Sequence, residues 1–128
     1  TLGTQLWVAD ADGSDAVNLN RTGWEDIAPA WSVDGGRIAF SSRQGTQGGH
    51  DIWVVDPDGG DPIRLTTVAG FGESWPVWRP DGLKVLFSAN QTGDAEIWVM
   101  DADGSDQIQV TFDPGFDSYP AWIRIPPP

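Results

Sequence analysis

Carboxylate side chains recur at three similar places in the chain, each close to an aromatic residue. The carboxylates are Glu25, Asp26, Glu73 and Asp117. The aromatic neighbours are Trp24, Phe71 and Phe116. If the fold brings these places around one opening, their charges would focus a negative field there and attract a metal ion or a cationic partner. The alternative is that they are solvated loop residues beside aromatic side chains that pack.

A second acidic pattern places two aspartates two residues apart, immediately before a glycine. The pairs are Asp10 and Asp12, Asp56 and Asp58, and Asp101 and Asp103. Oxygen ligands at alternate positions can wrap a hard cation such as Ca²⁺. However, the distant glutamate of a complete calcium-binding loop is missing, and Asp-Gly is also the strongest short signal for a hairpin turn. We therefore expect turns, with Ca²⁺ binding as the alternative.

Side chains suited to covalent or acid–base catalysis are scarce. The chain has no Cys and one His, His50, which lies in a glycine-rich segment. This composition excludes disulfides and thiolate chemistry, and it gives little support to a Ser-His-Asp triad or a histidine zinc site. We expect His50 to be a solvated loop residue. We also expect a binding protein that is not an enzyme and has no cofactor, apart from the Ca²⁺ alternative.

Eight tryptophans are many for 128 residues, and six of them fall at two recurrent positions. One position holds Trp7, Trp53 and Trp98, and the other holds Trp31, Trp78 and Trp122. Recurrence at fixed positions predicts packing in the core. Trp24 and Trp75 depart from this pattern. They are therefore the better candidates for exposed contacts with a ligand.

The charge balance excludes two classes of partner. Seven basic residues against 19 acidic ones give a net charge of −12. Such a surface repels nucleic-acid phosphates and anionic membranes, whereas it favours cations and basic partners. No apolar run reaches the length that spans a bilayer. We expect neither nucleic-acid binding nor membrane insertion.

An internal repeat reveals the elements that must position these residues. Its first series comprises Gln5–Gly13, Asp51–Gly59 and Glu96–Gly104, with the aligned tryptophans 46 and 45 residues apart. Its second series comprises Ala28–Trp31, Trp75–Trp78 and Tyr119–Trp122. Runs rich in Ile, Val, Phe and Trp between Asp-Gly pairs predict short antiparallel strands joined by tight turns. The sequence therefore predicts an all-β fold.

One strand of the middle repeat is apolar on both faces. Ile52 and Val54 share one face of a strand, and Trp53 and Val55 share the other. An antiparallel strand of this kind must be covered from both sides, as it is between stacked sheets. The repeated prolines Pro29, Pro76 and Pro120 donate no ladder hydrogen bond, which suits a partly unpaired edge strand.

Within one repeat the motifs run Pro-x-Trp, Asp-Gly, Ile-x-Phe-Ser, Ile-Trp-Val-x-Asp-x-Asp-Gly and Ile-x-Leu-Thr. This order resembles the propeller repeat of the TolB family over almost the whole chain. The resemblance implies four-stranded antiparallel blades, whose strands are lettered A to D outward from the propeller axis. It also implies a bacterial periplasmic or extracellular module that binds other proteins.

The number of strands is too small for a closed ring. The C and D strands of a partial blade fall in residues 1–22, whole blades in 23–67 and 68–112, and strand A of a further blade in 113–128. Propellers typically close with four to eight blades. The chain is therefore either part of a longer propeller or a unit that assembles.

Two copies would approach the six blades of a TolB-like ring, with strand B missing at each junction. Unpaired strand edges and bare blade faces favour association. Three prolines, Pro126 to Pro128, forbid a continuing ladder at the C-terminal junction. We nevertheless expect self-assembly, most simply as a homodimer.

The sequence leaves three functions open. The first is a non-catalytic scaffold for protein interaction that self-assembles to complete a propeller. The second is a metal-dependent or enzyme-accessory propeller that uses the acidic residues at its channel mouth. The third is a lectin-like module that binds glycans through Trp24 and Trp75.

Overall fold

The computed structural model of the chain describes residues 3–19, 23–45, 48–68 and 70–124, and these residues contain strands and no helix. The strands are β1 (Trp7–Val8), β2 (Val17–Asn18), β3 (Asp26–Trp31), β4 (Ile38–Ser42), β5 (Asp51–Val55), β6 (Ile63–Arg64), β7 (Glu73–Trp78), β8 (Lys84–Ala89), β9 (Glu96–Asp101) and β10 (Ile108–Gln109). Nothing in the described part of the chain is a helix long and apolar enough to cross a membrane.

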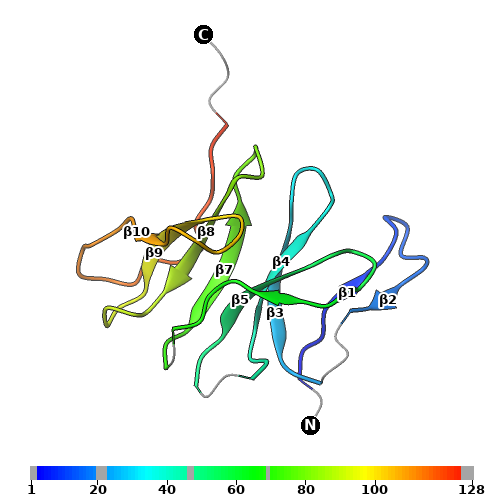
Figure 1. Cartoon of the computed structure of the whole chain (residues 1–128), viewed down its shortest axis with the longest axis horizontal. Helices are drawn as coiled ribbons and strands as arrows, with labels where there is room; N and C mark the ends of the chain where they lie inside the picture. Colours follow the sequence, from blue (N-terminus) through cyan, green and yellow to red (C-terminus); the bar gives the residue numbers. More distant parts are fainter. Residues whose placement is uncertain (1–2, 20–22, 46–47, 69, 125–128) are drawn as a thin grey trace.

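Three antiparallel sheets stand side by side in chain order (Figure 1). Strands β1 and β2 form a two-stranded first sheet, β3 to β6 form the four-stranded middle blade, and β7 to β10 form the four-stranded third blade. Within each blade the strands are neighbours in sequence order, which is the A-to-D arrangement of a propeller blade. The prediction of all-β, four-stranded antiparallel blades is confirmed, and the ring they belong to is partial.

The turns form where Asp-Gly pairs stand, because glycine adopts positive φ without strain. At the A–B turn of the middle blade, Gly35 has φ of 71° and its N–H donates to the Ser32 carbonyl at 2.9 Å. At the C–D turns, Asp12 accepts hydrogen bonds from the N–H and hydroxyl of Ser14, and Asp103 does the same with Ser105.

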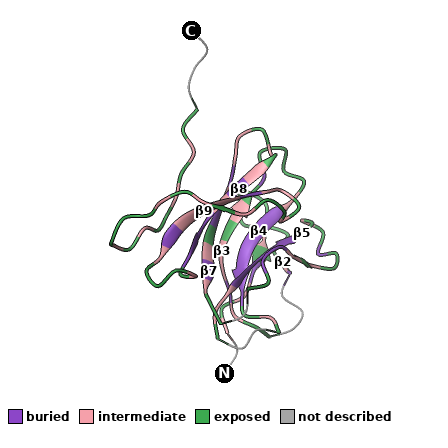
Figure 2. Cartoon of the chain, turned by 60° about the vertical axis from the view of Figure 1, so that its left-hand side comes forward, coloured by how far each residue is buried: buried purple, intermediate pink, exposed green. Residues whose placement is uncertain are grey.

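The middle blade is sandwiched, so all residues of β4 and β5 are buried (Figure 2). One face packs on the first sheet in a cluster that includes Ile38, Phe40, Trp53 and Val55 together with Leu6 and Leu19. The other face packs on the third blade in a cluster that includes Ala39, Ile52, Val54 and Leu65 together with Val85, Phe87 and Met100. The two-faced pattern of the C strand therefore indicated the correct environment.

The tryptophan prediction is correct for the inner positions and wrong at the N-terminal end. Trp53 and Trp78 are buried, and Trp98 packs against the core. Trp7 and Trp31 are instead 56% and 50% exposed. The reason is that, among the described residues, no preceding strand covers these two as preceding strands cover the equivalent tryptophans of the later blades.

A β-bulge interrupts the innermost strand of each whole blade. The register shifts between Ile27 and Ala30 in β3, and between Ser74 and Val77 in β7. At the bulge the residue before proline is left-handed, with φ of 52° at Ala28 and 59° at Trp75. Tyr119, at the same repeat position, has φ of 57° although it lies outside any strand.

Candidate functional site at the blade junctions and inner rim

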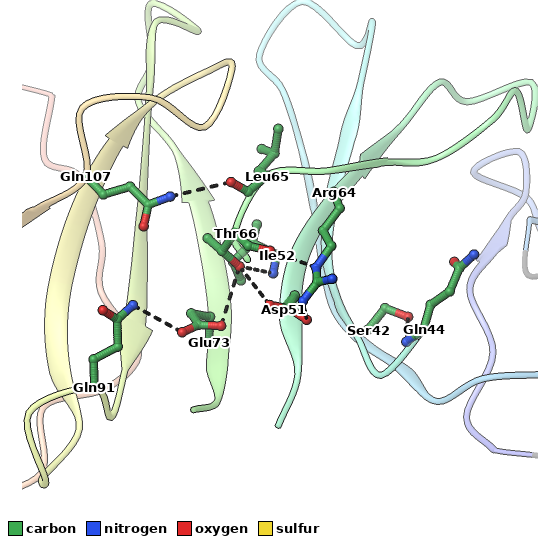
Figure 3. A network of polar contacts seen from close by, with 10 residues as sticks. All are labelled: Ser42, Gln44, Asp51, Ile52, Arg64, Leu65, Thr66, Glu73, Gln91 and Gln107. Carbon is green, nitrogen blue, oxygen red and sulfur yellow. Dashed lines mark hydrogen bonds and ion pairs between the residues drawn. The ribbon is translucent and has the colours of Figure 1, made fainter. Parts of the chain in front are cut away.

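A polar network joins the middle and third blades at the start of β7 (Figure 3). Glu73, the first residue of β7, is completely buried. The Thr66 hydroxyl oxygen lies 3.5 Å from a carboxylate oxygen of Glu73 and 3.5 Å from one of Asp51. The same hydroxyl accepts a hydrogen bond from the Ile52 N–H at 2.9 Å. Because a hydroxyl has one proton, Thr66 can donate to only one of the two carboxylates at a time.

A single cation balances this network. The Arg64 guanidinium donates to the Asp51 carboxylate at 2.8 Å, and its Nε donates to the Thr66 carbonyl at 2.9 Å. Asp51 is buried, whereas the Arg64 side chain is 31% exposed. The ion pair therefore neutralises Asp51. The hydrogen-bonding neighbours of Glu73 are instead uncharged, namely the Thr66 hydroxyl and the Gln91 amide at 3.2 Å.

The pKa of Glu73 is raised to about 7. Burial is the main cause, the Gln91 hydrogen bond opposes the shift, and the neighbouring Asp51 charge adds to it. A carboxyl group in a dry site loses the hydration that stabilises its charged form. Glu73 is therefore about half protonated near neutral pH. Its proton is available for a hydrogen bond that the ionised form cannot donate.

The three blades carry three versions of this network at equivalent positions. In the first sheet, Gln5 and Asn18 form a neutral pair, with the Asn18 amide donating to Gln5 at 2.8 Å. In the middle blade the pair is Asp51 and Arg64. In the third blade Glu96 stands at the acidic position, and Gln109 replaces the arginine.

In this third version, the Thr111 hydroxyl donates to Glu96 at 2.5 Å and accepts from the Ile97 N–H at 2.9 Å. The carboxylate oxygens of Glu96, Asp113 and Asp117 all lie within 4.8 Å of one another. Glu96 is buried, Asp117 is half-buried and Asp113 is exposed. Asp117 was expected to bind; Glu96 and Asp113 were not singled out. Such a group can hold a divalent cation in principle, although exposed carboxylates also gather without one.

The four carboxylates predicted at a channel mouth have unequal environments. Asp26 and Glu73 are buried at the starts of β3 and β7, so these two do not present carboxylates to solvent. This corrects the expectation of a solvent-facing acidic ring, and its cause is the packing of each strand A against the preceding sheet. The backbone N–H of each donates to that sheet, Asp26 to Thr4 and Glu73 to His50.

Glu25 is half-buried and pairs with Arg43 at 3.3 Å. The Nε2 of His50 lies 3.6 Å from the same carboxylate, and the His50 side chain is only 17% exposed. Burial lowers the pKa of His50 even though Glu25 opposes the shift. The prediction of a solvated histidine is wrong, because the loop that carries it packs on the start of the third blade.

The turn aspartates have the environment expected of a hairpin. Hydrogen bonds from Ser14 and Ser105 hold the pKa values of Asp12 and Asp103 below their usual range. Asp58 accepts from the Gly60 N–H at 3.3 Å, and Asp101 pairs with Lys84. The backbone carbonyls of Asp10, Asp56 and Asp101 accept the N–H of Gly13, Gly59 and Gly104. Ca²⁺ binding by these residues stays a prediction.

The three copies of strand A line a groove at the inner rim. Its volume is about 270 Å³, and its lining residues are Ala28, Pro29, Ala30, Trp75, Pro76, Val77, Tyr119 and Pro120. The rings of Trp75 and Tyr119 lie 4.5 Å apart between centroids, tilted by 45°. Trp75 is exposed as predicted, at 37%, and so is Trp24, at 42%, although Trp24 is not a lining residue of the groove.

Comparison with known proteins decides the family. The model of the TolB beta propeller domain matches residues 3–124. The chain belongs to this family.

The Tol-Pal system protein TolB of Albidiferax ferrireducens is 45% identical over 51 residues, which are 38% of this chain and 12% of that protein. TolB of Alcanivorax borkumensis is 29% identical over 89 residues, 70% of this chain and 20% of that protein. Among solved structures, TolB from Acinetobacter baumannii superposes with a TM-score of 0.75 at 29% identity, covering 88% of this chain and 28% of that one.

The chain thus spans no more than a fifth of the curated TolB proteins that it matches. A more distant likeness, to an oligogalacturonate lyase in complex with manganese, has a TM-score of 0.67 at 19% identity and covers 90% of this chain and 33% of that one. That likeness shows the fold alone. The acidic residues of this TolB-type chain must therefore be interpreted from their own geometry.

Sequence reasoning missed Asp51, Arg64, Thr66, Glu96 and Asp113. A signal for the first three was present, because Ile63-Arg64-Leu65-Thr66 recurs with Asn or Gln in place of arginine. A variable polar position between two positions that are always apolar indicates a side chain with a specific partner in each repeat. What it meets, a residue 13 positions earlier, only the hairpin pairing shows.

Proposed function

We propose that this chain is a non-catalytic scaffold for protein interaction, and that it binds an extended segment of a partner along the inner-rim groove. The supporting observation is the groove itself, in which Trp75 and Tyr119 stand together above three prolines. Its size suits a short peptide stretch better than a drug-sized ligand, for which pockets of roughly 300–1,000 Å³ are typical. No titratable side chain lines it apart from the tyrosine.

The backbone at the groove supports a binding role. A left-handed, non-glycine residue costs on the order of 1–3 kcal/mol, and here three occur at one repeat position. The left-handed backbone is thus constant at this repeat position, whereas the side chain that it carries changes from Ala28 to Trp75 to Tyr119. Repeat proteins build binding surfaces in this way, by keeping the backbone conformation of a position and varying its side chain.

The relatives give this proposal a setting. Both curated relatives are Tol-Pal system proteins. We place this chain in the periplasm by that likeness and expect its partner to be another component of a Tol-Pal system. The lectin alternative lacks support, because Trp24 and Trp75 do not share a groove and few polar groups accompany Trp75.

Binding measurements with two groove variants test the proposal. Purified Tol-Pal proteins are passed over the immobilised chain, and Trp75→Ala and Tyr119→Ala are each expected to weaken capture at least about tenfold, as interface aromatics do. Trp24→Ala removes an equally exposed tryptophan outside the groove, so it serves as the matched control. If the parent chain and the three variants capture the Tol-Pal proteins equally, the groove is not the binding site.

The assembly part of the proposal rests on repeated interblade contacts that are missing at the N-terminal end. Trp78 Nε1 donates to the Ala30 carbonyl at 3.1 Å, and Trp122 Nε1 donates to the Val77 carbonyl at 3.2 Å. The next member of this series would join Trp31 to an Ala121 carbonyl, which a second copy can supply. Half-exposed Trp31 and Trp7 would then be covered by that copy.

Sedimentation tests the assembly. We expect a mass of two chains, and we expect Trp31→Phe, which removes the indole N–H but keeps an aromatic ring, to weaken the dimer. Val33→Ser changes a more exposed residue of the neighbouring turn and should leave the mass unchanged. A folded monomer at all concentrations would contradict self-assembly and leave the groove proposal standing.

The metal alternative now depends on Glu96, Asp113 and Asp117. None of the turn aspartates belongs to this group of the described residues. The group lacks the cation that Arg64 supplies in the middle blade. Thermal melts with and without Ca²⁺ test whether a bound ion takes that place.

A further inference from the structure

The backbone along the inner-rim groove is unsuited to pairing with an added β-strand. Pro29, Pro76 and Pro120 line the groove and have no N–H to donate to a ladder. The residue before each of these prolines is left-handed, which interrupts an extended run of backbone. A segment that binds in the groove must therefore be held mainly by side chains.

The polar atoms that side chains bring to the groove are hydrogen-bond donors. Among the lining residues, only Trp75 and Tyr119 have a polar side chain. Within the described part of the chain, neither the Trp75 indole N–H nor the Tyr119 hydroxyl forms a hydrogen bond. The indole N–H can only donate, and the phenol hydroxyl can donate to a carbonyl as well. A ligand that presents carbonyl groups and few N–H groups matches this arrangement.

Two aromatic rings from neighbouring strand A segments form a wall of the groove. Trp75 belongs to β7 and Tyr119 to the segment that follows the third blade, and their ring centroids are 4.5 Å apart. The rings remain 37% and 68% exposed. Tyrosine and tryptophan combine an apolar body with one polar atom, so they can pack on a proline ring and bind a nearby backbone carbonyl at once.

The surroundings of the groove are negatively charged near Tyr119. Asp117 precedes it by two residues, and the carboxylate oxygens of Asp117, Glu96 and Asp113 lie within 4.8 Å of one another. The ion pairs of the described residues include none of these three carboxylates. A basic residue of the ligand is therefore attracted to this end of an otherwise uncharged groove.

We propose that the groove binds a proline-rich segment in the polyproline II conformation, with a basic residue beside its prolines. The inference rests on the proposed scaffold function and names the class of partner segment. A polyproline II helix has no internal hydrogen bonds, so its carbonyls are free to accept from Trp75 and Tyr119. Because the helix is formed before binding, little conformational entropy is lost when it enters the groove.

Two fluorescent peptides, each about nine residues long, are the probes, and the first spans roughly 28 Å as a polyproline II helix. The first has an arginine at each end and prolines between them. The second keeps both arginines but alternates valine and threonine, which favours a β-strand. Fluorescence anisotropy with the full chain should show saturable binding of the proline peptide, and binding at least about tenfold weaker for the second peptide.

Conservative variants of the chain locate the binding site. Tyr119→Phe keeps the ring and removes the hydroxyl, so it should weaken binding of the proline peptide about threefold to tenfold, the effect of one hydrogen bond. Trp75→Phe removes the indole N–H and should weaken binding at least as much. Trp24→Phe changes an exposed tryptophan outside the groove and should bind as the parent does. Melting temperatures check that the variants are folded.

The charge at the end of the groove is tested separately. Asp117→Asn should weaken binding of the proline peptide by about twofold to fivefold, as expected for a partly exposed ion pair. Asp58→Asn removes the same charge at an exposed C–D turn and should have no effect. Replacing both arginines of the peptide by glutamate should weaken binding to the parent chain further than Asp117→Asn does.

Equal binding of the two peptides, or proline-peptide binding that Tyr119→Phe and Trp75→Phe leave unchanged, would overturn the proposal. Capture of Tol-Pal proteins is a separate measurement. If the groove variants reduce that capture but the parent binds no proline peptide, the scaffold function stands and the ligand class is wrong. If the proline peptide binds in the groove and capture is unaffected by the variants, the ligand class stands and the Tol-Pal partner is wrong.

Discussion

The middle and third blades have the same strands in the same order, yet one blade is sandwiched and the other is open on one side. Ile52 and Val54 are buried between two sheets, and their counterparts Ile97 and Val99 are only half covered. The two blades differ mainly in what lies next to them. The comparison teaches that the apolar residues of a blade are fully buried only where a neighbouring sheet packs against them.

The polar networks differ in the same way. In the covered junction, Asp51 has Arg64 as a partner and Glu73 is shielded from water. In the open one, Glu96 has no arginine partner, and Asp113 and Asp117 remain partly in solvent, which screens their mutual repulsion.

The largest expected effect tests the burial contrast. Phe87→Ala removes a completely buried ring from the covered junction and should lower the free energy of unfolding by about 3–5 kcal/mol. Val110→Ala, at a half-exposed position of the third blade, should change it by less than about 0.5 kcal/mol. Denaturant unfolding measures both. Similar losses at the two sites would mean that Val110 is covered in solution.

The next effect concerns pH. The pKa of Glu73 is raised to about 7 in the folded chain from a usual 4.5, so the folded state retains a proton that the unfolded state loses between these values. The stability contributed by the neutral form is full below about pH 4.5 and is lost as the pH rises through 7.

Glu73→Gln cannot ionise. Its free energy of unfolding should therefore rise relative to that of the parent by up to about 3 kcal/mol as the pH increases from 5 to 8. Unfolding of both proteins across this range is the measurement. Thr92→Ser, at an exposed residue that does not titrate, is the control, and its difference from the parent should stay flat. A flat difference for Glu73→Gln would mean that the buried carboxyl keeps an ordinary pKa.

A smaller effect tests the ion pair. Arg64→Gln copies the third-blade residue into the middle blade and leaves Asp51 buried without its cation. Because Arg64 is 31% exposed, the loss should be about 1–2 kcal/mol, less than for a fully buried pair. The double variant Asp51→Gln with Arg64→Asn copies the Gln5 and Asn18 pair and should recover most of the lost stability. Failure to recover would show that the three networks are not interchangeable.

The smallest effect is expected at the open network. Asp113→Asn relieves repulsion within an exposed group, so in the absence of Ca²⁺ it should raise the melting temperature slightly. If an ion binds there, Ca²⁺ should stabilise the parent and not the variant. Identical responses of both proteins would remove the metal alternative.

Much of the fold could be predicted because the same pattern of strand and turn residues recurs along the chain. Asp-Gly pairs located the turns, and the apolar pattern of Ile52, Trp53, Val54 and Val55 required cover on two sides. The site was harder to predict. Glu73 and Asp117 occupy the same repeat position and were expected to be alike, but the first is sealed by neighbouring strands and the second lies at an edge.

By itself the sequence determined the strands, their turns, the family and the acidic charge, because these depend on local residue types and on their recurrence. Only the tertiary structure decided which copies of each residue are covered, which carboxylate gains a cation, and that Trp75 meets Tyr119 across two blades. These depend on distances between segments 13 to 48 residues apart in the chain, which no single repeat encodes.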